Sequence, residues 1–307
     1  MTAPPVPILT ACAGSANQTS FAMASLDDTH LHAYLSRIGH PLPSQPDLAT
    51  LDSLIAAQLA HIPFENIDVL LQRPIKINLD AVFDKLVANA RGGYCFEQNT
   101  LLAAALHALG YVVTPLAARV RWNVPEDVPT MQSHMLLRVE AAHHSYIVDV
   151  GFGGPTPYRA MPLPQAEQAD PSFPYRLISV ETAGAAFHVY DLEVKGASAW
   201  FKLYQFDLSP QQAIDFEPRN WYTSTHPDSL FRNALTMARS QGDTRLTLVN
   251  GDFAVRAADG SVQRQHLETP AAIVEALGDR FGLTLDPAGQ AQLAQMLPAL
   301  IETRRNS

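Results

Sequence analysis

The chain has 307 residues, of which 47% are hydrophobic, and a formal net charge of −9. This length and apolar content support a large core and indicate two or three compact domains. Basic residues do not cluster anywhere along the chain, which argues against a nucleic-acid partner. The apolar runs are far too short to cross a membrane. With only two cysteines, a disulfide framework is not expected, and a reducing, cytoplasmic setting fits best.

Residues 1–25 differ from a secretory signal. They lack the basic segment with which a signal peptide begins, and Pro4, Pro5 and Pro7 interrupt the apolar stretch. We therefore predict that residues 1–25 form a disordered extension, or precede an alternative start at Met23.

The chain from residue 26 to residue 114 is predicted to be a helical bundle. Apolar residues recur at helical spacing in four segments, residues 26–39, 47–61, 79–90 and 95–109. Gly39 and Gly110 are expected to end the first and the fourth helix, because glycine readily adopts the left-handed conformation that follows many helices.

Residues 115–210 show a different pattern. Short segments rich in β-branched and aromatic residues alternate with turn signals, which is typical of an antiparallel sheet or barrel. The predicted strands lie within residues 111–122, 134–141, 145–152, 175–182, 187–194 and 199–208.

Residues 211–307 combine both patterns. A helix is predicted within residues 226–239, with Pro227 near its start, and a hairpin within residues 244–262, turning at Asn250-Gly251. Two helices follow, at about residues 270–281 and 286–301. The predicted fold class is therefore α+β, with a helical bundle, an antiparallel β-barrel and a C-terminal α/β domain.

The stretch "RGGYCFEQN", residues 91–99, raises the question of a nucleophile. Cys95 lies where a glycine turn meets the predicted fourth helix, and a helix N-terminus favours a thiolate. Gly92 and Gly93 are expected to permit a tight turn with positive φ. Most single cysteines are small buried hydrophobic residues, however, so this position alone leaves both interpretations open.

A nucleophilic cysteine needs a base, and the base needs a group that orients it. His134 opens the strand "HMLLRV", and Asp149 lies in the next strand among Ile147, Val148 and Val150. If the two strands form a hairpin that turns near residue 142, His134 and Asp149 meet at its open end. A carboxylate in an apolar strand needs a partner, so Cys95, His134 and Asp149 together favour catalysis.

Five motifs in order resemble the arylamine N-acetyltransferase family. The motifs are "IPFENI" at 62–67, "RGGYCFEQN" at 91–99, "HMLLRV" at 134–139, "VDVGFGG" at 148–154 and "NWYTSTHPDSLF" at 220–231. Intervals of 39 residues from Cys95 to His134 and 15 from His134 to Asp149 also resemble the family pattern. The resemblance covers the chain from about Leu26 onward. It implies a bundle carrying the cysteine, a barrel carrying the histidine and aspartate, an α/β lid, and a core like that of papain-type proteases and transglutaminases.

The resemblance also implies a ping-pong acetyl transfer in xenobiotic metabolism. Acetyl-CoA would donate its acetyl group to Cys95, and an arylamine, arylhydrazine or N-hydroxyarylamine would accept it, without a metal ion. Phe64 and Phe152 match family positions that line the substrate pocket, and each fits a core aromatic equally well. Phe231 falls in the motif at residues 220–231, which in the family packs toward the active-site cleft, and is the third candidate for substrate binding. Gly153 and Thr225 are the corresponding candidates for contact with CoA.

The other polar residues of the cysteine motif are expected to support the site rather than to react. Arg91 and Glu97 would form a charged pair around the turn, or cap neighbouring backbone, and Asn99 would form local hydrogen bonds.

Other functions remain open at this point. A cysteine peptidase or a transglutaminase-like enzyme would use the same three residues to cleave or cross-link amides. An amide synthase of natural-product assembly would keep the scaffold and close a macrocycle. A non-catalytic binding module could share the fold, although the presence of all three residues argues against a decayed enzyme.

Overall fold

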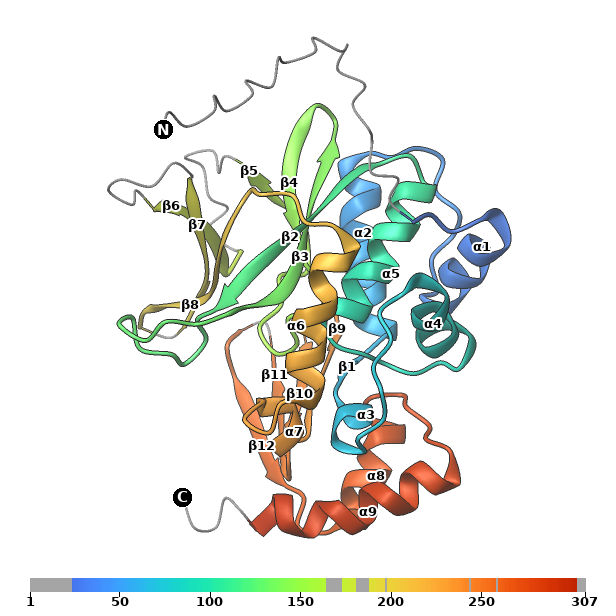
Figure 1. Ribbon diagram of the computed structural model, residues 1–307, viewed down its shortest axis with the longest axis vertical. Helices are drawn as coiled ribbons and strands as arrows, with labels where there is room; N and C mark the ends of the chain where they lie inside the picture. Colours follow the sequence, from blue (N-terminus) through green and yellow to red (C-terminus); the bar gives the residue numbers. More distant parts are fainter. Residues whose placement is uncertain are drawn as a thin grey trace, which may run out of the picture.

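The computed structural model describes residues 24–163, 173–180, 188–196, 198–242, 244–257 and 259–302. Helices from the first third of the chain lie on one side of a large antiparallel sheet, and a second sheet with the last two helices lies below them (Figure 1). This arrangement confirms the predicted α+β class. The predicted extension lies outside the described residues, except for Ala24 and Ser25.

The four helices predicted in the first third of the chain are confirmed. They are α1 (Asp28–Arg37), α2 (Leu48–His61), α4 (Leu79–Phe83) continued by a π-helical turn η1 (Asp84–Ala88), and α5 (Cys95–Ala108). The side chains of Asp27 and Asp47 cap the first two helices by accepting backbone N–H groups. Gly39 and Gly110 have φ of 65° and 91°, as expected of glycines that follow helix ends.

A seven-stranded antiparallel sheet follows, with β5 and β6 as its edge strands. Its order is β5-β4-β3-β2-β8-β7-β6, and it curves into a barrel-like shape. The strands are β2 (Val112–Val120), β3 (Gln132–Ala141), β4 (His144–Val148), β5 (Met161–Leu163), β6 (Tyr175–Val180), β7 (Val189–Lys195) and β8 (Trp200–Asp207). The six predicted strands are thus confirmed, and the short β5 is an addition.

The hairpin of β3 and β4 carries the candidate site. Leu137 pairs with Val148 and Ala141 with His144, and the turn residues Ala142 and His143 have positive φ. The predicted turn near residue 142 is therefore confirmed, and its open end faces α5.

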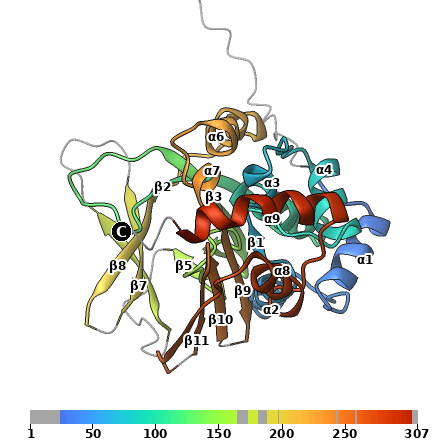
Figure 2. The same cartoon turned by 90° about the horizontal axis from the view of Figure 1, so that it is seen from below.

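The second sheet joins a segment of the first third of the chain to the last third. Its order is β1-β9-β10-β11-β12, with β1 (Phe64–Glu65), β9 (Thr236–Gln241), β10 (Thr244–Val249), β11 (Asp252–Arg256) and β12 (Val262–His266). Asn250 turns the predicted β10–β11 hairpin with φ of 53°. The short helix α3 (Ile67–Leu70) and the predicted helices α8 (Pro270–Asp279) and α9 (Pro287–Glu302) contribute to the hydrophobic core of this sheet. Figure 2 shows β9–β11 between the large sheet and α2.

The predicted helix over residues 226–239 is wrong. Only α7 (Leu230–Asn233) is helical, and β9 begins at Thr236. β9 lies between β1 and β10, and both of its faces are covered, since Met237 and Ala238 belong to different hydrophobic clusters. The sequence of β9 therefore lacks the alternation of polar and apolar residues that indicates a strand with one buried face.

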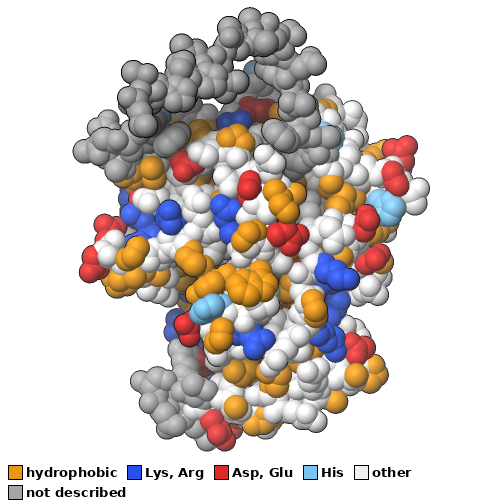
Figure 3. All heavy atoms as spheres, in the orientation of Figure 1, with side chains coloured by type: hydrophobic (Ala, Val, Ile, Leu, Met, Phe, Trp, Pro, Cys, Tyr) orange, Lys and Arg blue, Asp and Glu red, His pale blue; other side chains and the backbone are white. Residues whose placement is uncertain are grey.

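The sequence analysis also missed α6 (Ala213–Thr225). This helix contains Pro218, and its buried stripe is mainly polar: Phe216, Asn220, Thr223 and Ser224. Large hydrophobic side chains gather instead on the outer surface of α6 and α7, where Ile214, Trp221 and Leu230 are exposed (Figure 3). Across the part of the chain that the structure describes, no helix has both the length and the apolar character needed to cross a membrane.

Candidate active site

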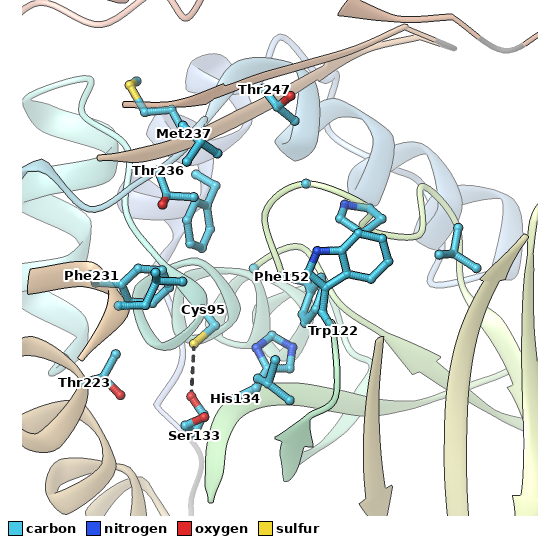
Figure 4. A pocket seen from close by; sticks show the side chains of 18 of the residues that line it. Cys95, Trp122, Ser133, His134, Phe152, Thr223, Phe231, Thr236, Met237 and Thr247 are labelled. Atoms are coloured by element: carbon cyan, nitrogen blue, oxygen red, sulfur yellow. Dashed lines mark hydrogen bonds between the residues drawn. The ribbon is translucent and has the colours of Figure 1, made fainter. Parts of the chain in front are cut away.

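Cys95 is the first residue of α5, and its side chain is buried against the start of β3. The Glu97 carboxylate caps this helix by accepting the Tyr94 backbone N–H at 3.0 Å. The thiol Sγ lies 3.9 Å from the carbonyl oxygen of Ser133, beside the His134 ring (Figure 4). The thiol is therefore held at a helix N-terminus, where partial positive charge favours an anion.

The two glycines before Cys95 have a different role from the one expected. Neither Gly92 nor Gly93 is among the residues with positive φ, so that expectation is wrong. Glycine is needed there because a Cβ on Gly92 would lie 2.3 Å from Pro63 O, and one on Gly93 would lie 2.6 Å from Glu97 Oε2. The left-handed residue of this turn is Ala90, with φ of 49°.

A network of buried ion pairs packs against the turn that precedes Cys95. Lys85 Nζ lies 2.8 Å from Glu97 Oε1 and 2.9 Å from Asp68 Oδ2. Arg91 Nη2 lies 2.8 Å from Glu65 Oε1 and 3.4 Å from Asp68 Oδ1. Arg91 and Glu97 thus pair with other residues rather than with each other. Burial raises the pKa of Glu97, while Lys85 acts in the opposite direction.

His134 and Asp149 meet as the hairpin predicts. Asp149 lies one residue beyond the last β3–β4 pair, Leu137 with Val148, and its Oδ2 is 2.7 Å from His134 Nε2. Both side chains are buried, with 3% and 1% exposed. The contact therefore lies in a region of low dielectric, where a charged pair is strengthened and its geometry is fixed.

Asn99 holds the aspartate in place, a contact that the sequence analysis did not identify. Its Nδ2 donates to Asp149 Oδ1 at 3.1 Å and to Met135 O at 2.8 Å, and its Oδ1 accepts the Val150 N–H at 3.2 Å. The Gly151 N–H also donates to Asp149 Oδ1, at 2.8 Å. The position of Asn99, one helical turn after Cys95, was the signal for this contact.

Gly151 also allows the two strands and α5 to approach. A Cβ at this position would lie 2.5 Å from Cys95 Cα and 2.8 Å from Asn99 Nδ2. No other residue type fits there without moving the thiol or the asparagine.

Two aromatic rings enclose His134. The ring of Phe152 stands edge-on to it at 5.2 Å between centroids, and the tilted ring of Tyr204 lies at 4.9 Å. Tyr204 comes from β8 and is fully buried, and the sequence analysis did not identify it. Its inward position on an alternating strand was the available signal.

Burial and the aspartate have opposite effects on the charge of His134. Burial lowers the pKa of the imidazole, but the charge and hydrogen bond of Asp149, with a contribution from Cys95, raise it to about 10. For Asp149 the directions are reversed: burial raises the pKa of the carboxyl group, but His134 outweighs burial, and the pKa of Asp149 is lowered. An imidazolium paired with a carboxylate is therefore the favoured state at neutral pH.

A cavity of about 800 Å³ leads from the surface to Cys95 and His134. Phe64, Phe152 and Phe231 line it, together with Trp122 and Met131 from the rim of the large sheet. Figure 4 shows Phe152 and Trp122 on one side of Cys95, and Phe231 on the other. The cavity is thus a largely aromatic space that ends at a thiol and an imidazole.

The two candidate CoA contacts lie outside the lining of this cavity. Gly153 has φ of 86°, and a Cβ there would lie 3.2 Å from the Phe64 ring, so this glycine packs against the cavity wall from outside. Thr225 is exposed at the end of α6, and its Oγ1 donates to Trp221 O. Their neighbours Gly154 and Thr223 do line the cavity. Within the described ranges, no three His, Cys, Asp or Glu side chains gather to hold a metal ion.

Comparison with known proteins agrees with this site and fold. A family model described as N-acetyltransferase matches residues 47–290. The chain is 40% identical over 280 residues to the arylamine N-acetyltransferase of Mycolicibacterium smegmatis, covering 87% of this chain and 98% of that protein. It is 35% identical over 280 residues to the arylamine N-acetyltransferase / N-hydroxyarylamine O-acetyltransferase of Salmonella typhimurium, covering 88% and 95%.

A solved structure gives the same result. The Mycobacterium marinum arylamine N-acetyltransferase in complex with CoA aligns with a TM-score of 0.81 at 34% identity, over 88% of this chain and 99% of that one. Both sequence and structure are thus shared over nearly the whole length of the relatives. The chain belongs to the arylamine N-acetyltransferase family.

Proposed function

We propose that the protein transfers the acetyl group of acetyl-CoA to arylamines, arylhydrazines and N-hydroxyarylamines through an acetyl-Cys95 intermediate. The observation that carries the proposal is a thiol at a helix start, beside an imidazolium held by a buried carboxylate, at the end of an aromatic cavity. Family membership supports the same reaction, since relatives are named for arylamine N-acetylation and one was solved with CoA.

In the first half reaction, the Cys95 thiolate attacks the carbonyl carbon of acetyl-CoA. The tetrahedral intermediate collapses, the C–S bond to CoA breaks, and the departing thiolate takes the proton of the His134 imidazolium. The products are free CoA, acetyl-Cys95 and a neutral imidazole. One thioester replaces another, so this step needs no external energy.

In the second half reaction, the nitrogen of a neutral arylamine attacks the acetyl-cysteine. His134 takes the amine proton while the Cys95 thiolate leaves, which restores the starting ion pair. Acetylation also removes the contribution of the free thiol that raises the His134 pKa, so a larger fraction of the imidazole is neutral at this stage and able to accept a proton. Asp149 keeps the ring oriented through Nε2, which leaves Nδ1 for proton exchange.

We assign Phe64, Phe152 and Phe231 to the binding of the aromatic acceptor. An arylamine ring would pack among these side chains with its nitrogen directed toward Cys95. We keep Gly153 and Thr225 as proposed contacts of CoA, since Gly153 is next to Gly154 and Thr225 is two positions from Thr223, and both of these neighbours line the cavity.

Intact-protein mass spectrometry after incubation with acetyl-CoA tests the proposal. One acetyl adduct is expected on the unaltered protein and none on Cys95→Ala, and Cys95→Ser should lower acetyl transfer by about 10³-fold or more. Near-normal transfer by Cys95→Ser would rule the mechanism out. No adduct together with hydrolysis of a peptide ester would indicate a peptidase instead.

We further propose a cytoplasmic enzyme of xenobiotic metabolism with domains at residues 26–114, 115–210 and 211–307. A free, buried thiol nucleophile suits a reducing compartment. Limited proteolysis tests the boundaries, because cleavage in the connections nearest to them, at residues 109–111 before β2 and at residues 208–212 after β8, should leave stable fragments.

A further inference from the structure

Gln98 is a fully buried amide on the helix that carries the thiol. It lies in α5, three residues after Cys95, and its side chain is closed off from solvent. Its Nε2 donates to Ile62 O at 3.1 Å and to Pro63 O at 3.0 Å, and lies 3.5 Å from Gly93 O. Burial of an amide is unfavourable unless its hydrogen bonds are made, so this glutamine marks a place where backbone carbonyls need a donor.

The carbonyls that Gln98 binds lie directly before Phe64. Phe64 opens β1, a strand of two residues, and its ring lines the cavity. On one side Phe64 pairs with Ala238 of β9, and on the other side a single bridge joins it to Gly93. A strand this short has few backbone bonds, so its position also depends on how the preceding segment is held. Gln98 therefore links the helix of the thiol to a wall of the cavity.

Two further side chains determine the orientation of the Gln98 amide. A carbonyl oxygen only accepts, so the end of Gln98 that faces Ile62 O and Pro63 O is its NH₂ group. Its Oε1 accepts from Gln58 Nε2 at 3.0 Å, and Gln58 Oε1 accepts from the Tyr34 hydroxyl at 2.7 Å. If either amide turned over, donor would face donor and acceptor would face acceptor. The bonds thus run in one direction, from α1 through α2 to α5.

The chain of bonds from Tyr34 to Gln98 is buried along its whole length. Tyr34, Gln58 and Gln98 are each 0% exposed, and the nitrogen and oxygen of both side-chain amides are hydrogen-bonded. Burial raises the pKa of Tyr34, so its hydroxyl keeps the proton that it donates. A buried polar network that is satisfied throughout is rigid, and the loss of one member leaves its neighbour unpaired.

We infer that Gln98 positions the ring of Phe64 relative to Cys95 and thereby determines how an aromatic acceptor reaches the acetyl group. Gln58 and Tyr34 act through Gln98. The inference rests on the proposed function, because it concerns the discharge of acetyl-Cys95 by an acceptor that has a ring.

Other bonds hold the reacting groups themselves. Asp149 Oδ1 accepts from Asn99 Nδ2 and from the Gly151 N–H, and its Oδ2 binds His134. Loss of the Gln98 amide should therefore leave the thiol and the imidazole in place and displace the ring of Phe64. A glutamine that served stability alone would, when replaced, weaken every activity to the same degree.

Two acceptors separate these possibilities. Phenylhydrazine and hydrazine carry the same reacting group, and only the first has a ring. Acetyl-Cys95 is formed with acetyl-CoA, excess donor is removed, and the loss of the adduct to each acceptor is followed by rapid quenching and mass spectrometry. The variants are Gln98→Met, Gln58→Met and Tyr34→Phe. Tyr111→Phe is the matched control, because the hydroxyl of this buried tyrosine donates to Asp47 O, at the start of α2.

Gln98→Met keeps the length of the side chain and removes the amide. It should lower the second-order rate of discharge by phenylhydrazine about tenfold, and leave discharge by hydrazine and acetylation by acetyl-CoA nearly unchanged. Gln58→Met and Tyr34→Phe should lower discharge by phenylhydrazine about threefold, because the Gln98 amide remains but is less firmly oriented. Tyr111→Phe should change neither rate.

A double-mutant cycle tests whether Gln58 acts through Gln98. In the Gln98→Met background, Gln58→Met should have no further effect on discharge by phenylhydrazine. Thermal unfolding of each variant shows how much stability is lost. Tyr111→Phe shows that loss of a buried hydroxyl bond elsewhere does not alter the preference between the two acceptors.

Equal losses with both acceptors, no loss with phenylhydrazine, or additive effects in the cycle would overturn the inference. If Gln98→Met does not fold, Tyr34→Phe decides by the same two rates, because it removes one hydroxyl and keeps both amides. Failure of the unaltered protein to form acetyl-Cys95 would instead overturn the proposed function.

Discussion

At the scale of single residues, the proposed chemistry depends on keeping a proton on His134. Asp149 accepts from Nε2 at 2.7 Å, and its charge outweighs the effect of burial on the imidazole. A histidine at its ordinary pKa would be mostly neutral at pH 7, and the thiol would then have no cation beside it. The aspartate is therefore as necessary to the thiolate as the histidine is.

The pH dependence of Cys95 acetylation follows from these pKa values. The pKa of His134 is raised from 6.5 to about 10, so the ion pair is retained at neutral pH and is lost as the pH rises through about 10. The pKa of Asp149 is lowered from 3.8, so on the acid side the pair is lost only below that value. Acetylation rates should form a broad plateau between these limits. Asp149→Asn should shift the alkaline limb to lower pH, and an alkaline limb near 6.5 in the unaltered protein would contradict this account.

Asn99 should act as a positioning residue. Asn99→Ala removes the donor to Asp149 Oδ1 and leaves the Met135 carbonyl without its partner, at a cost of about 1–3 kcal/mol in stability. We expect kcat to fall about tenfold with a smaller change in KM, and the alkaline limb to move to lower pH. Thr100→Ala, the neighbouring position on α5, is the control. An unchanged pH profile in Asn99→Ala would mean that the asparagine is only structural.

At the scale of elements, the turn before α5 depends on close backbone approach. The five-residue stretch from Arg91 to Cys95 lies against Pro63 and the Glu97 side chain, with room only for hydrogen at Gly92 and Gly93. The sequence showed that two glycines were required, but not the reason, because φ freedom and lack of space both select glycine. Only the position of β1 beside this turn distinguishes the two.

Replacement of Gly92 should test this packing. Gly92→Ala places a Cβ 2.3 Å from Pro63 O, and we expect it to lower the free energy of unfolding by about 1–3 kcal/mol and to slow Cys95 acetylation. Gly278→Ala is the matched control, since nothing lies within 4 Å of a Cβ there. It lies within α8 and should raise stability by about 0.5–1 kcal/mol. Chemical denaturation measures both, and a neutral Gly92→Ala would refute the steric explanation.

Most elements were predictable where periodicity was clear. The helices around Leu51 and Leu101, and the hairpin that brings His134 to Asp149, follow from apolar spacing and turn residues. Residues 213–241 were not predictable in this way. The buried face of α6 is mainly polar, the helix contains Pro218, and β9 is covered on both faces. Both elements are determined by long-range contacts that a local pattern does not contain.

At the scale of the whole molecule, distant segments form one site. Asn66, which follows β1, links the first third of the chain to the last: its Nδ2 donates to Phe231 O at 2.8 Å and to Ala234 O at 2.7 Å, and its Oδ1 accepts the Thr236 N–H at 2.8 Å. These bonds fix α7, which carries a wall of the cavity. The sequence indicated the two motifs at residues 62–67 and 220–231. It did not indicate that Asn66 in the first motif bonds to Phe231 in the second.

Asn66→Ala should therefore affect both stability and binding. The loss of three hydrogen bonds, one buried and two partly buried, should cost about 2–4 kcal/mol, and the release of Phe231 should raise KM for the arylamine more than it lowers kcat. Asn89→Ala removes one exposed local bond, to Asp84 O, and should change neither. Steady-state kinetics with thermal unfolding checks both outcomes. A variant that loses stability with no change in KM would separate this link from the acceptor pocket.

The central claim is that acetyl-Cys95 lies on the reaction path. Rapid quenching of the protein mixed with acetyl-CoA, followed by mass spectrometry, measures the rate at which the adduct forms and the rate at which an added arylamine discharges it. The account predicts that both steps are at least as fast as steady-state turnover, and that the adduct persists until the amine is added. An adduct that forms or decays more slowly than turnover, or turnover that survives in Cys95→Ala, would contradict it.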